Sequence, residues 1–167
     1  MLHFARIPAL LCLSMAGIFY VIAEQLRTTG HEIPLISDIT AAAARKRDEN
    51  KFVLGPVTLV LGVLSAALLW KEVPAAAGIY ALAFGDGLAS LAGKTFGKIR
   101  IPYTHGKTAE GSLTCFAAIF SSCFFVTQNC QTSLIAAITG ALFEVLPLKD
   151  FDNLIIPVLI GGLVTYL

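Results

Sequence analysis

Six apolar segments, each close to the ~20 residues that an α-helix needs to cross a bilayer, occupy most of the 167-residue chain. They run over residues 7–26, 52–70, 73–93, 112–130, 131–147 and 151–167. Charged residues make up only 14% of the chain, whereas soluble domains average about 25%. So little polar surface could not cover a water-soluble core. We therefore expect an all-α, polytopic integral membrane protein with about six transmembrane helices, in which residues 1–167 form a single domain.

The charged residues exclude one class of partner and set the expected orientation. The net charge is +1, so no binding of nucleic acid is expected. In a six-helix arrangement, ten basic residues fall on one side of the membrane and two on the other. The ten are Arg27, Arg45, Lys46, Arg47, Lys51, Lys94, Lys98, Arg100, Lys107 and Lys149, and the two are Arg6 and Lys71. Because cytoplasmic loops carry the excess of basic residues, we expect the first side to face the cytoplasm and both termini to face away from it.

Three acidic residues, Glu24, Asp86 and Glu144, lie within the apolar segments. Ionisable side chains inside a bilayer are costly and are functional candidates by default. All three fall in the half of the membrane next to the basic loops, which predicts a polar cavity open to the cytoplasm. For Glu24 an alternative remains open, because Arg27 follows three residues later and an i,i+3 ion pair would explain both side chains.

Asp86 stands between Gly85 and Gly87. A buried helix has no local reason for this pattern, since each Gly costs about 1 kcal/mol relative to Ala. Glycines let a ligand approach the backbone closely, and irregular helix at membrane depth is tolerated where it lines protein or a water-filled cavity. The alternative is that the glycines serve close helix packing and that Asp86 is paired elsewhere.

Glycines and lysines recur in the loop that follows, over residues 93–112. Glycines expose backbone N–H groups and lysines supply point charges, which together suit phosphate. Lys107 stands at the predicted start of a helix, whose positive dipole end also favours an anion. The spacing approaches a Walker A loop but has one residue too many and follows a membrane helix, which excludes a P-loop fold. For the lysines alone, attraction to anionic lipid is the open alternative.

A last candidate begins at Glu144, after which a proline-bounded turn leads to Asp152 and Asn153. These side chains suit a metal or nucleotide site, because Mg²⁺ usually binds through one or two carboxylates plus substrate phosphates. Alternatively, Asp152 and Asn153 cap the last helix.

In these motifs the sequence resembles the CTP-dependent lipid kinases: dolichol kinase, phytol kinase and the yeast-type diacylglycerol kinase, a family related to phosphatidate cytidylyltransferase. The matching elements are Glu24-x-x-Arg27, Arg45-x-x-x-Glu49, Gly85-Asp86-Gly87-x-Ala89, Gly93-Lys94-x-x-Gly97, Lys107-Thr108-x-Glu110-Gly111-Ser112 and Glu144 with Asp152-Asn153-Leu154-x-x-Pro157. Family members usually begin with further helices and an Arg-Lys-x-x-His element. This chain has no such element, so we expect a membrane-embedded catalytic domain that is either truncated at its start or a short variant of the family.

The resemblance implies a role for each matching residue. Asp86, Lys94, Lys107 and Glu110 would be catalytic, with Asp86 as the base for the lipid hydroxyl or as a metal ligand. The nucleotide would be bound by Gly85, Gly87, Gly93, Lys94, Gly97, Lys98, Lys107, Thr108, Gly111, Ser112 and Asn153. Mg²⁺ or another divalent cation would be held by Asp86, Glu110, Glu144 and Asp152. Glu24, Arg45 and Glu49 would support the cytoplasmic rim of the site.

The expected function is transfer of the γ-phosphoryl group of CTP, or of another nucleoside triphosphate, to the hydroxyl of a membrane lipid. Dolichol or another polyprenol, phytol and diacylglycerol are all open as acceptors. Phosphoryl transfer needs positioning, metal and positive charge more than covalent catalysis. A cavity facing the cytoplasm, in a plasma, inner or endoplasmic reticulum membrane, would let a soluble donor meet a lipid there.

Other functions stay open at this point. A phosphatidate cytidylyltransferase, which makes CDP-diacylglycerol, needs the same acids, metal and basic loop. More remote alternatives are a small transporter with Asp86 as its ion site and a membrane scaffold without catalytic activity. A homo-oligomer is compatible with six short helices that must enclose a cavity.

Overall fold

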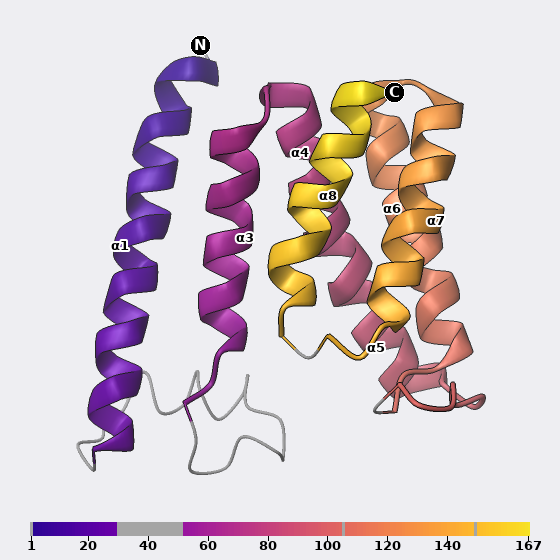
Figure 1. Cartoon of the computed structure of the whole chain (residues 1–167), viewed down its shortest axis with the longest axis horizontal. Coiled ribbons are helices and arrows are strands. Elements are labelled where there is room, and N and C mark those ends of the chain that lie inside the picture. The colour runs from indigo at the N-terminus through magenta and orange to yellow at the C-terminus, as the bar shows by residue number, and fades with distance from the viewer. Residues whose placement is uncertain (1, 30–51, 105, 149) are drawn as a thin grey trace.

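The computed structural model describes residues 2–29, 52–104, 106–148 and 150–167, and this part of the chain is a bundle of helices (Figure 1). The helices are α1 (Leu2–Thr28), α3 (Gly55–Leu69), α4 (Glu72–Tyr80), the π-helix η2 (Ala81–Asp86), α5 (Gly87–Phe96), α6 (Ala109–Thr127), α7 (Cys130–Val145) and α8 (Asp152–Tyr166). α4, η2 and α5 follow one another without a break and form one rod, Glu72–Phe96. Within the described ranges there is no strand, and one isolated antiparallel bridge joins Arg100 to Thr108.

Each predicted apolar segment contains one helical rod, which confirms the all-α membrane class. Arg6–Thr28, Glu72–Phe96 and Ala109–Thr127 are long and apolar enough to cross a membrane. The other three rods, α3, α7 and α8, are apolar but have only 15–16 residues. At 1.5 Å per residue they reach about 23 Å, which is less than the ~30 Å hydrocarbon core of a bilayer.

Prolines explain two of the ends at which helices are shorter than predicted. α3 begins at Gly55 with Pro56 in its first turn, where a missing N–H and a fixed φ suit a helix start. α7 ends at Val145 because Leu146, which precedes Pro147, is extended with ψ 143°. The proline ring disfavours the helical conformation for the residue before it.

The two ends of the bundle differ in charge. Both termini and the α3–α4 and α6–α7 connections lie at one end, whereas the last turns of α1, α5 and α7 lie at the other (Figure 1). The second end carries Arg27, Lys94, Lys98, Arg100 and Lys107, as predicted, and we call it the basic end. Arg6 and Lys71 belong to the opposite end. Arg45, Lys46, Arg47, Lys51 and Lys149 lie outside the described residues.

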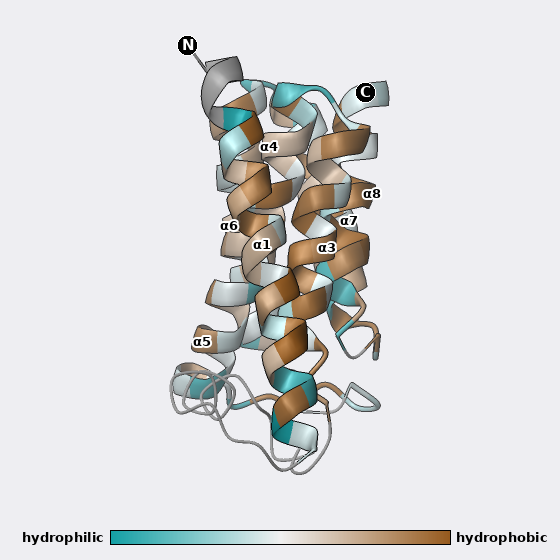
Figure 2. Ribbon diagram, turned by 90° about the vertical axis from the view of Figure 1, so that its left-hand side faces the viewer, coloured by the Kyte–Doolittle hydropathy of each residue, from teal (hydrophilic) through white to brown (hydrophobic). Residues whose placement is uncertain are grey.

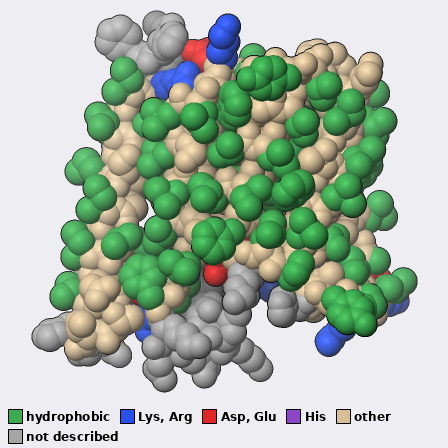
Figure 3. Space-filling view, in the orientation of Figure 1, with side chains coloured by type: hydrophobic (Ala, Val, Ile, Leu, Met, Phe, Trp, Pro, Cys, Tyr) green, Lys and Arg blue, Asp and Glu red, His purple; other side chains and the backbone are tan. Residues whose placement is uncertain are grey.

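Between the two ends the surface is apolar. Figure 2 shows hydrophobic residues along the middle of the helices, and Figure 3 shows hydrophobic side chains covering the same height on one face, with Lys and Arg above and below. This distribution is that of a protein embedded in a bilayer. The compartment that the basic end faces remains a prediction.

α8 is packed backbone to backbone against two other helices. A Cβ atom added at Gly62 in α3 would lie 2.1 Å from the Asn153 carbonyl oxygen, and one added at Gly78 in α4 would lie 2.1 Å from the Pro157 carbonyl oxygen. Pro157 has no N–H, so it leaves the carbonyl group four residues earlier, that of Asn153, without its helical partner. Small residues that allow close backbone approach are the usual means of helix association in membranes.

Polar contacts hold α1 against α3 at both ends. At the terminal end, Arg6 donates to the Ala67 carbonyl in the last turn of α3 and to the carbonyl of Trp70, the C-cap of α3. At the basic end, Arg27 binds both oxygens of Glu24, at 2.7 and 2.9 Å, and the Val53 amide donates to Glu24 Oε1 at 2.8 Å. The predicted i,i+3 ion pair is therefore confirmed. Because Glu24 is fully buried and also binds backbone, it fixes the start of α3 to the end of α1.

We expect Gly78→Ala to lower the free energy of unfolding by about 1–3 kcal/mol or more, because the added methyl group must displace α8. Gly87→Ala is the matched control, since nothing lies within 4 Å of its added Cβ, and Ala at a helical position gains up to about 1 kcal/mol over Gly. Thermal unfolding of both variants in detergent measures the difference. Equal stability of the two variants would contradict the close contact between α4 and α8.

Candidate active site

A buried ionic cluster lies inside the basic end. The Lys107 ammonium lies 3.0 Å from Glu144 Oε1 and 3.7 Å from Asp152 Oδ2, and it also donates to the Glu144 carbonyl. The two carboxylate side chains are only 8% and 6% exposed, whereas the Lys107 side chain is 24% exposed. We call these three residues the Lys107 cluster. Buried charges of this kind are retained when they are paired, and here two helices present carboxylates to one cation.

Three chain segments bring the cluster together. Lys107 directly precedes Thr108, the N-cap of α6, whose hydroxyl accepts the Gly111 N–H at 3.2 Å. The backbone of Lys107 is fixed by the Ile101 N–H, which donates to the Lys107 carbonyl at 2.9 Å. Glu144 lies in the last turn of α7 and Asp152 begins α8, so the short turn between them brings both acids to the same depth.

Ser112 orients Glu144. Its hydroxyl donates to Glu144 Oε2 at 3.2 Å, while Glu144 Oε1 faces the Lys107 ammonium. Each carboxylate oxygen of Glu144 thus has its own donor, which a buried carboxylate requires. The resemblance assigned Ser112 to the nucleotide, and in the structure it positions an acid of the cluster.

Asp86 lies at the end of the π-helix η2, half-buried. The buried Cys115 thiol lies within electrostatic range of Asp86, Glu144 and Lys107, so Asp86 belongs to the same region of the bundle as the cluster. The π-helix was not predicted, although Gly-Asp-Gly indicated irregular helix here. π-helical turns are rare and occur frequently at functional sites.

The two glycines beside Asp86 have different surroundings. A Cβ at Gly85 would lie 2.8 Å from Ile119 Cγ1, whereas a Cβ at Gly87 would meet nothing within 4 Å. Gly85 therefore serves the packing of η2 on α6, which was one of the alternatives. Only Gly87 leaves backbone open to an approaching group.

Three further glycines lie where α5 crosses the start of α6. A Cβ at Gly93 or Gly111 would lie 3.0–3.1 Å from Thr108 Oγ1, and one at Gly97 would lie 2.2 Å from the Gly93 carbonyl. These glycines permit the crossing that sets the position of Lys107. Their binding to a nucleotide, predicted from the resemblance, remains a prediction.

The other predicted residues lie around the cluster. Glu110 accepts the backbone N–H groups of Lys98 at 3.0 Å and of Ile99 at 3.3 Å, and so holds the loop after α5. The side chains of Lys94 and Lys98 are exposed at the basic end. Asn153 donates to the Gly55 carbonyl and to Thr58 Oγ1, both at 3.4 Å, which ties α8 to α3. Arg45 and Glu49 lie outside the described residues.

The acids are not gathered into one metal cage. Within the described part of the chain, no group of three or more His, Cys, Asp and Glu side chains is placed to share a metal ion. Glu144 and Asp152 nevertheless face a common cation, the Lys107 ammonium. A pair of carboxylates is the usual protein contribution to a Mg²⁺ site completed by substrate phosphates and water.

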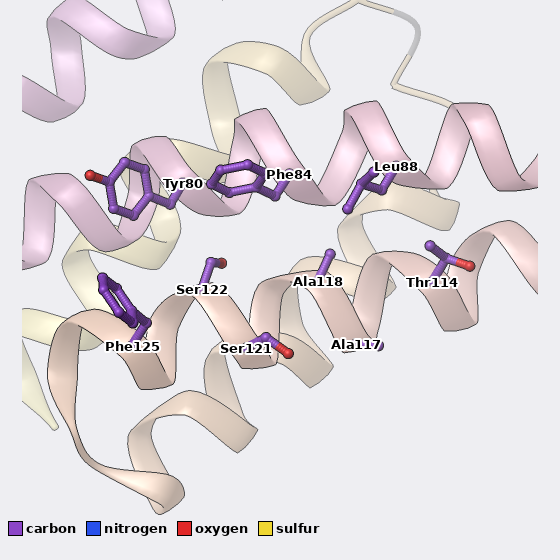
Figure 4. Close-up of a pocket in the computed structure, with 9 residues that line it drawn as sticks. All are labelled: Tyr80, Phe84, Leu88, Thr114, Ala117, Ala118, Ser121, Ser122 and Phe125. Carbon is purple, nitrogen blue, oxygen red and sulfur yellow. The ribbon is translucent and has the colours of Figure 1, made fainter.

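An apolar groove runs between the Glu72–Phe96 rod and α6 (Figure 4). It has a volume of about 680 Å³ and is lined by Tyr80, Phe84, Leu88, Thr114, Ala117, Ala118, Ser121, Ser122 and Phe125. Phe84 and Leu88 are 49% and 43% exposed, so the groove opens on the outer surface. On α6, Thr114 of the groove and Ser112 of the site are two positions apart and point to opposite sides. The groove is therefore separated from the Lys107 cluster by the body of α6.

Comparison with known proteins gives relatives of one kind. The chain is 29% identical to phytol kinase 1, chloroplastic, of Arabidopsis thaliana over 153 residues, which cover 80% of the chain and 50% of that relative. It is 29% identical to farnesol kinase, chloroplastic, of Arabidopsis thaliana over 126 residues, which cover 66% and 41%. It is 32% identical to probable phytol kinase 1, chloroplastic, of Glycine max over 102 residues, which cover 58% and 33%.

These relatives support a relation of the chain to kinases of lipid alcohols. The chain spans about half the length of the first relative and less of the other two. No protein-family model matches the sequence. No solved structure matches it either.

We expect Lys107→Met to lower the free energy of unfolding by about 2 kcal/mol, because Glu144 and Asp152 lose the ammonium that they share. The expected loss is below the ~3–5 kcal/mol typical of fully buried pairs, since Lys107 is partly exposed. Lys94→Met, which changes an exposed lysine of the same end, is the control and should leave stability within about 0.5 kcal/mol. Chemical unfolding in detergent measures both, and an unchanged Lys107→Met variant would show that the cluster adds no stability.

Proposed function

We propose that the chain transfers the γ-phosphoryl group of CTP to the hydroxyl of a membrane lipid alcohol, and that the reaction takes place at the basic end. The observation that carries the proposal is the similarity to phytol and farnesol kinases over most of the chain. Phytol and farnesol are the acceptor classes that these relatives suggest. The buried ionic cluster, which lies in the same region of the bundle as Asp86, supplies the kind of site that the reaction needs.

The membrane setting supports this reaction. A lipid alcohol keeps its apolar body in the bilayer and brings its hydroxyl to the interface, where a soluble nucleotide is available. Ionisable residues are expensive at membrane depth and mark functional sites. In this chain the buried acids Glu24, Glu144 and Asp152 all lie at the basic end, together with the exposed side chains of Lys94 and Lys98.

The proposed chemistry assigns Asp86 to the acceptor. The hydroxyl oxygen of the lipid attacks the γ-phosphorus, the bond from that phosphorus to the β–γ bridging oxygen breaks, and CDP leaves. Asp86 accepts the proton of the hydroxyl, which is the role of a general base. Gly87, which has open space beside its backbone, lets the reacting group come close.

Lys107 and the two acids of its cluster are assigned to the donor. A lysine is a point charge on a flexible stem and binds phosphate well. A divalent cation such as Mg²⁺, when bound, would neutralise charge on the β- and γ-phosphates. Glu144 and Asp152 are the residues proposed to hold it, because they present carboxylates from two helices to one cation position. The choice of CTP rests on the motif resemblance.

The proposal is tested with purified protein, Mg²⁺, phytol or farnesol, and CTP labelled at either the α- or the γ-phosphate. We expect γ-label to move into the organic phase and α-label to stay in water as CDP. A parallel reaction contains phosphatidic acid in place of the alcohol. Movement of α-label into the organic phase in that reaction would support the cytidylyltransferase alternative. Movement of neither label with any lipid alcohol would overturn the kinase proposal.

We expect Asp86→Asn to lower the transfer rate about 100-fold or more, the usual range for the loss of a general base. The fold should persist, because Asn has nearly the same shape as Asp. Glu72→Gln, which changes an acid at the opposite end of the same rod, should keep full activity. Initial rates and unfolding temperatures of both variants are measured together, and near-normal turnover by Asp86→Asn would remove Asp86 from the mechanism.

A further inference from the structure

We propose that the Lys107 ammonium competes with a divalent cation for Glu144 and Asp152, so that Lys107 leaves the two carboxylates when the cation binds. This inference rests on the proposed function, because it takes Glu144 and Asp152 as the residues that hold the cation. It goes beyond that function by stating how the site is loaded with its charged ligands before any transfer takes place.

The two carboxylates of the Lys107 cluster each have one oxygen on a protein donor and another turned to Lys107. The Ser112 hydroxyl donates to Glu144 Oε2 at 3.2 Å. The Asn153 N–H donates to Asp152 Oδ1 at 3.0 Å. The other two oxygens, Glu144 Oε1 and Asp152 Oδ2, lie 3.0 and 3.7 Å from the Lys107 ammonium. Both carboxylates are therefore oriented by donors besides Lys107 and keep facing one shared cation position when the lysine leaves.

That position takes one cation at a time. Mg²⁺ lies ~2.0–2.1 Å from its ligand oxygens, so a Mg²⁺ ion bound to both carboxylates would lie where the ammonium now lies between them. Two cations side by side would also repel each other, and more strongly where water is excluded. The two carboxylate side chains are only 8% and 6% exposed. Lys107 and the divalent cation are therefore alternative partners of the same two oxygens.

The side chain of Lys107 can move while its backbone stays in place. The Ile101 N–H holds the Lys107 carbonyl, and Thr108 caps α6 directly after it. The side chain is 24% exposed, and a lysine carries its charge on a flexible four-carbon stem. The ammonium can therefore turn from the carboxylates toward a phosphate group on its exposed side without a rearrangement of the loop.

Release of the lysine and entry of the cation are linked, because two buried carboxylates without a cation are costly. A nucleotide phosphate attracts the ammonium, and the carboxylates that it leaves then attract a divalent cation. Without nucleotide, the affinity for the cation is reduced by the fraction of molecules in which the lysine has left. By thermodynamic linkage, the nucleotide and the cation each raise the affinity for the other by the same factor.

The test measures Mn²⁺ binding to the purified full chain in neutral detergent without nucleotide, with free Mn²⁺ counted by electron paramagnetic resonance. We expect Lys107→Met to bind Mn²⁺ about tenfold more tightly than the unchanged protein, the gain if the lysine leaves the carboxylates about one-tenth of the time. Arg100→Met, which removes an exposed positive charge from the same end, should change the affinity less than about twofold, because exposed charges are screened. Glu144→Gln added to Lys107→Met should abolish this site.

A second measurement uses the unchanged protein, because Lys107→Met is expected to be less stable. The chain is treated with an amine-acylating reagent with and without Mn²⁺, and mass spectrometry locates the modified lysines. We expect saturating Mn²⁺ to raise the modification rate of Lys107 by up to about tenfold, because the ion frees the ammonium from the carboxylates. The rate at Lys71, which is exposed at the opposite end, should stay the same.

Either measurement can overturn the competition. Equal or weaker Mn²⁺ binding by Lys107→Met would do so, as would unchanged reactivity of Lys107 at saturating Mn²⁺. No Mn²⁺ binding by either protein would overturn it as well and would remove Glu144 and Asp152 as the cation site. Neither measurement requires turnover, so a chain that shows the competition but transfers no γ-label would lose the kinase proposal and keep this one.

Discussion

The pairing of buried charge at the basic end determines how the rest of that end is built. Glu144 and Asp152 are nearly inaccessible, and inside a membrane protein such carboxylates need a cation and hydrogen-bond donors. Lys107 supplies the cation and Ser112 a donor. To deliver Lys107, the loop after α5 must turn back against α6, which requires the close crossing at Gly93, Gly97 and Gly111. The glycines at this crossing are thus explained by packing, because they let Lys107 reach Glu144 and Asp152.

The two glycines beside Asp86 have different structural roles, one in packing and one in access. Ile119 occupies the space where a side chain at position 85 would lie, so a glycine there allows the close contact between η2 and α6. Gly87 has open space, so its absence of a side chain serves access. The single pattern Gly-Asp-Gly therefore combines packing on one side of Asp86 with an opening on the other, at the end of the π-helix.

Sequence reasoning predicted those features that depend on local pattern. Long apolar runs identified the six helical rods of the described residues, and the i,i+3 spacing identified the Glu24–Arg27 pair. The Lys107 cluster could be predicted only as three separate candidates, because its members are far apart in the chain and no local period relates them. The start of α3 and the end of α7 are set by prolines, and a pattern of apolar residues alone does not predict their effect. The π-helix was not predicted, because the hydrophobic pattern of one segment does not distinguish a π-helical turn from an α-helical one.

α6 separates two environments that a membrane enzyme must keep apart. Its inner side carries Ser112 toward the ionic cluster and Cys115 and Ile119 into the core, whereas its outer side lines the apolar groove. Near the basic end, α5 and α6 close on each other at Gly93 and Gly111, so the groove begins only beyond this crossing, at Thr114. α6 thus presents polar and core residues on one side and the apolar groove on the other, and the crossing near its start keeps the groove apart from the cluster.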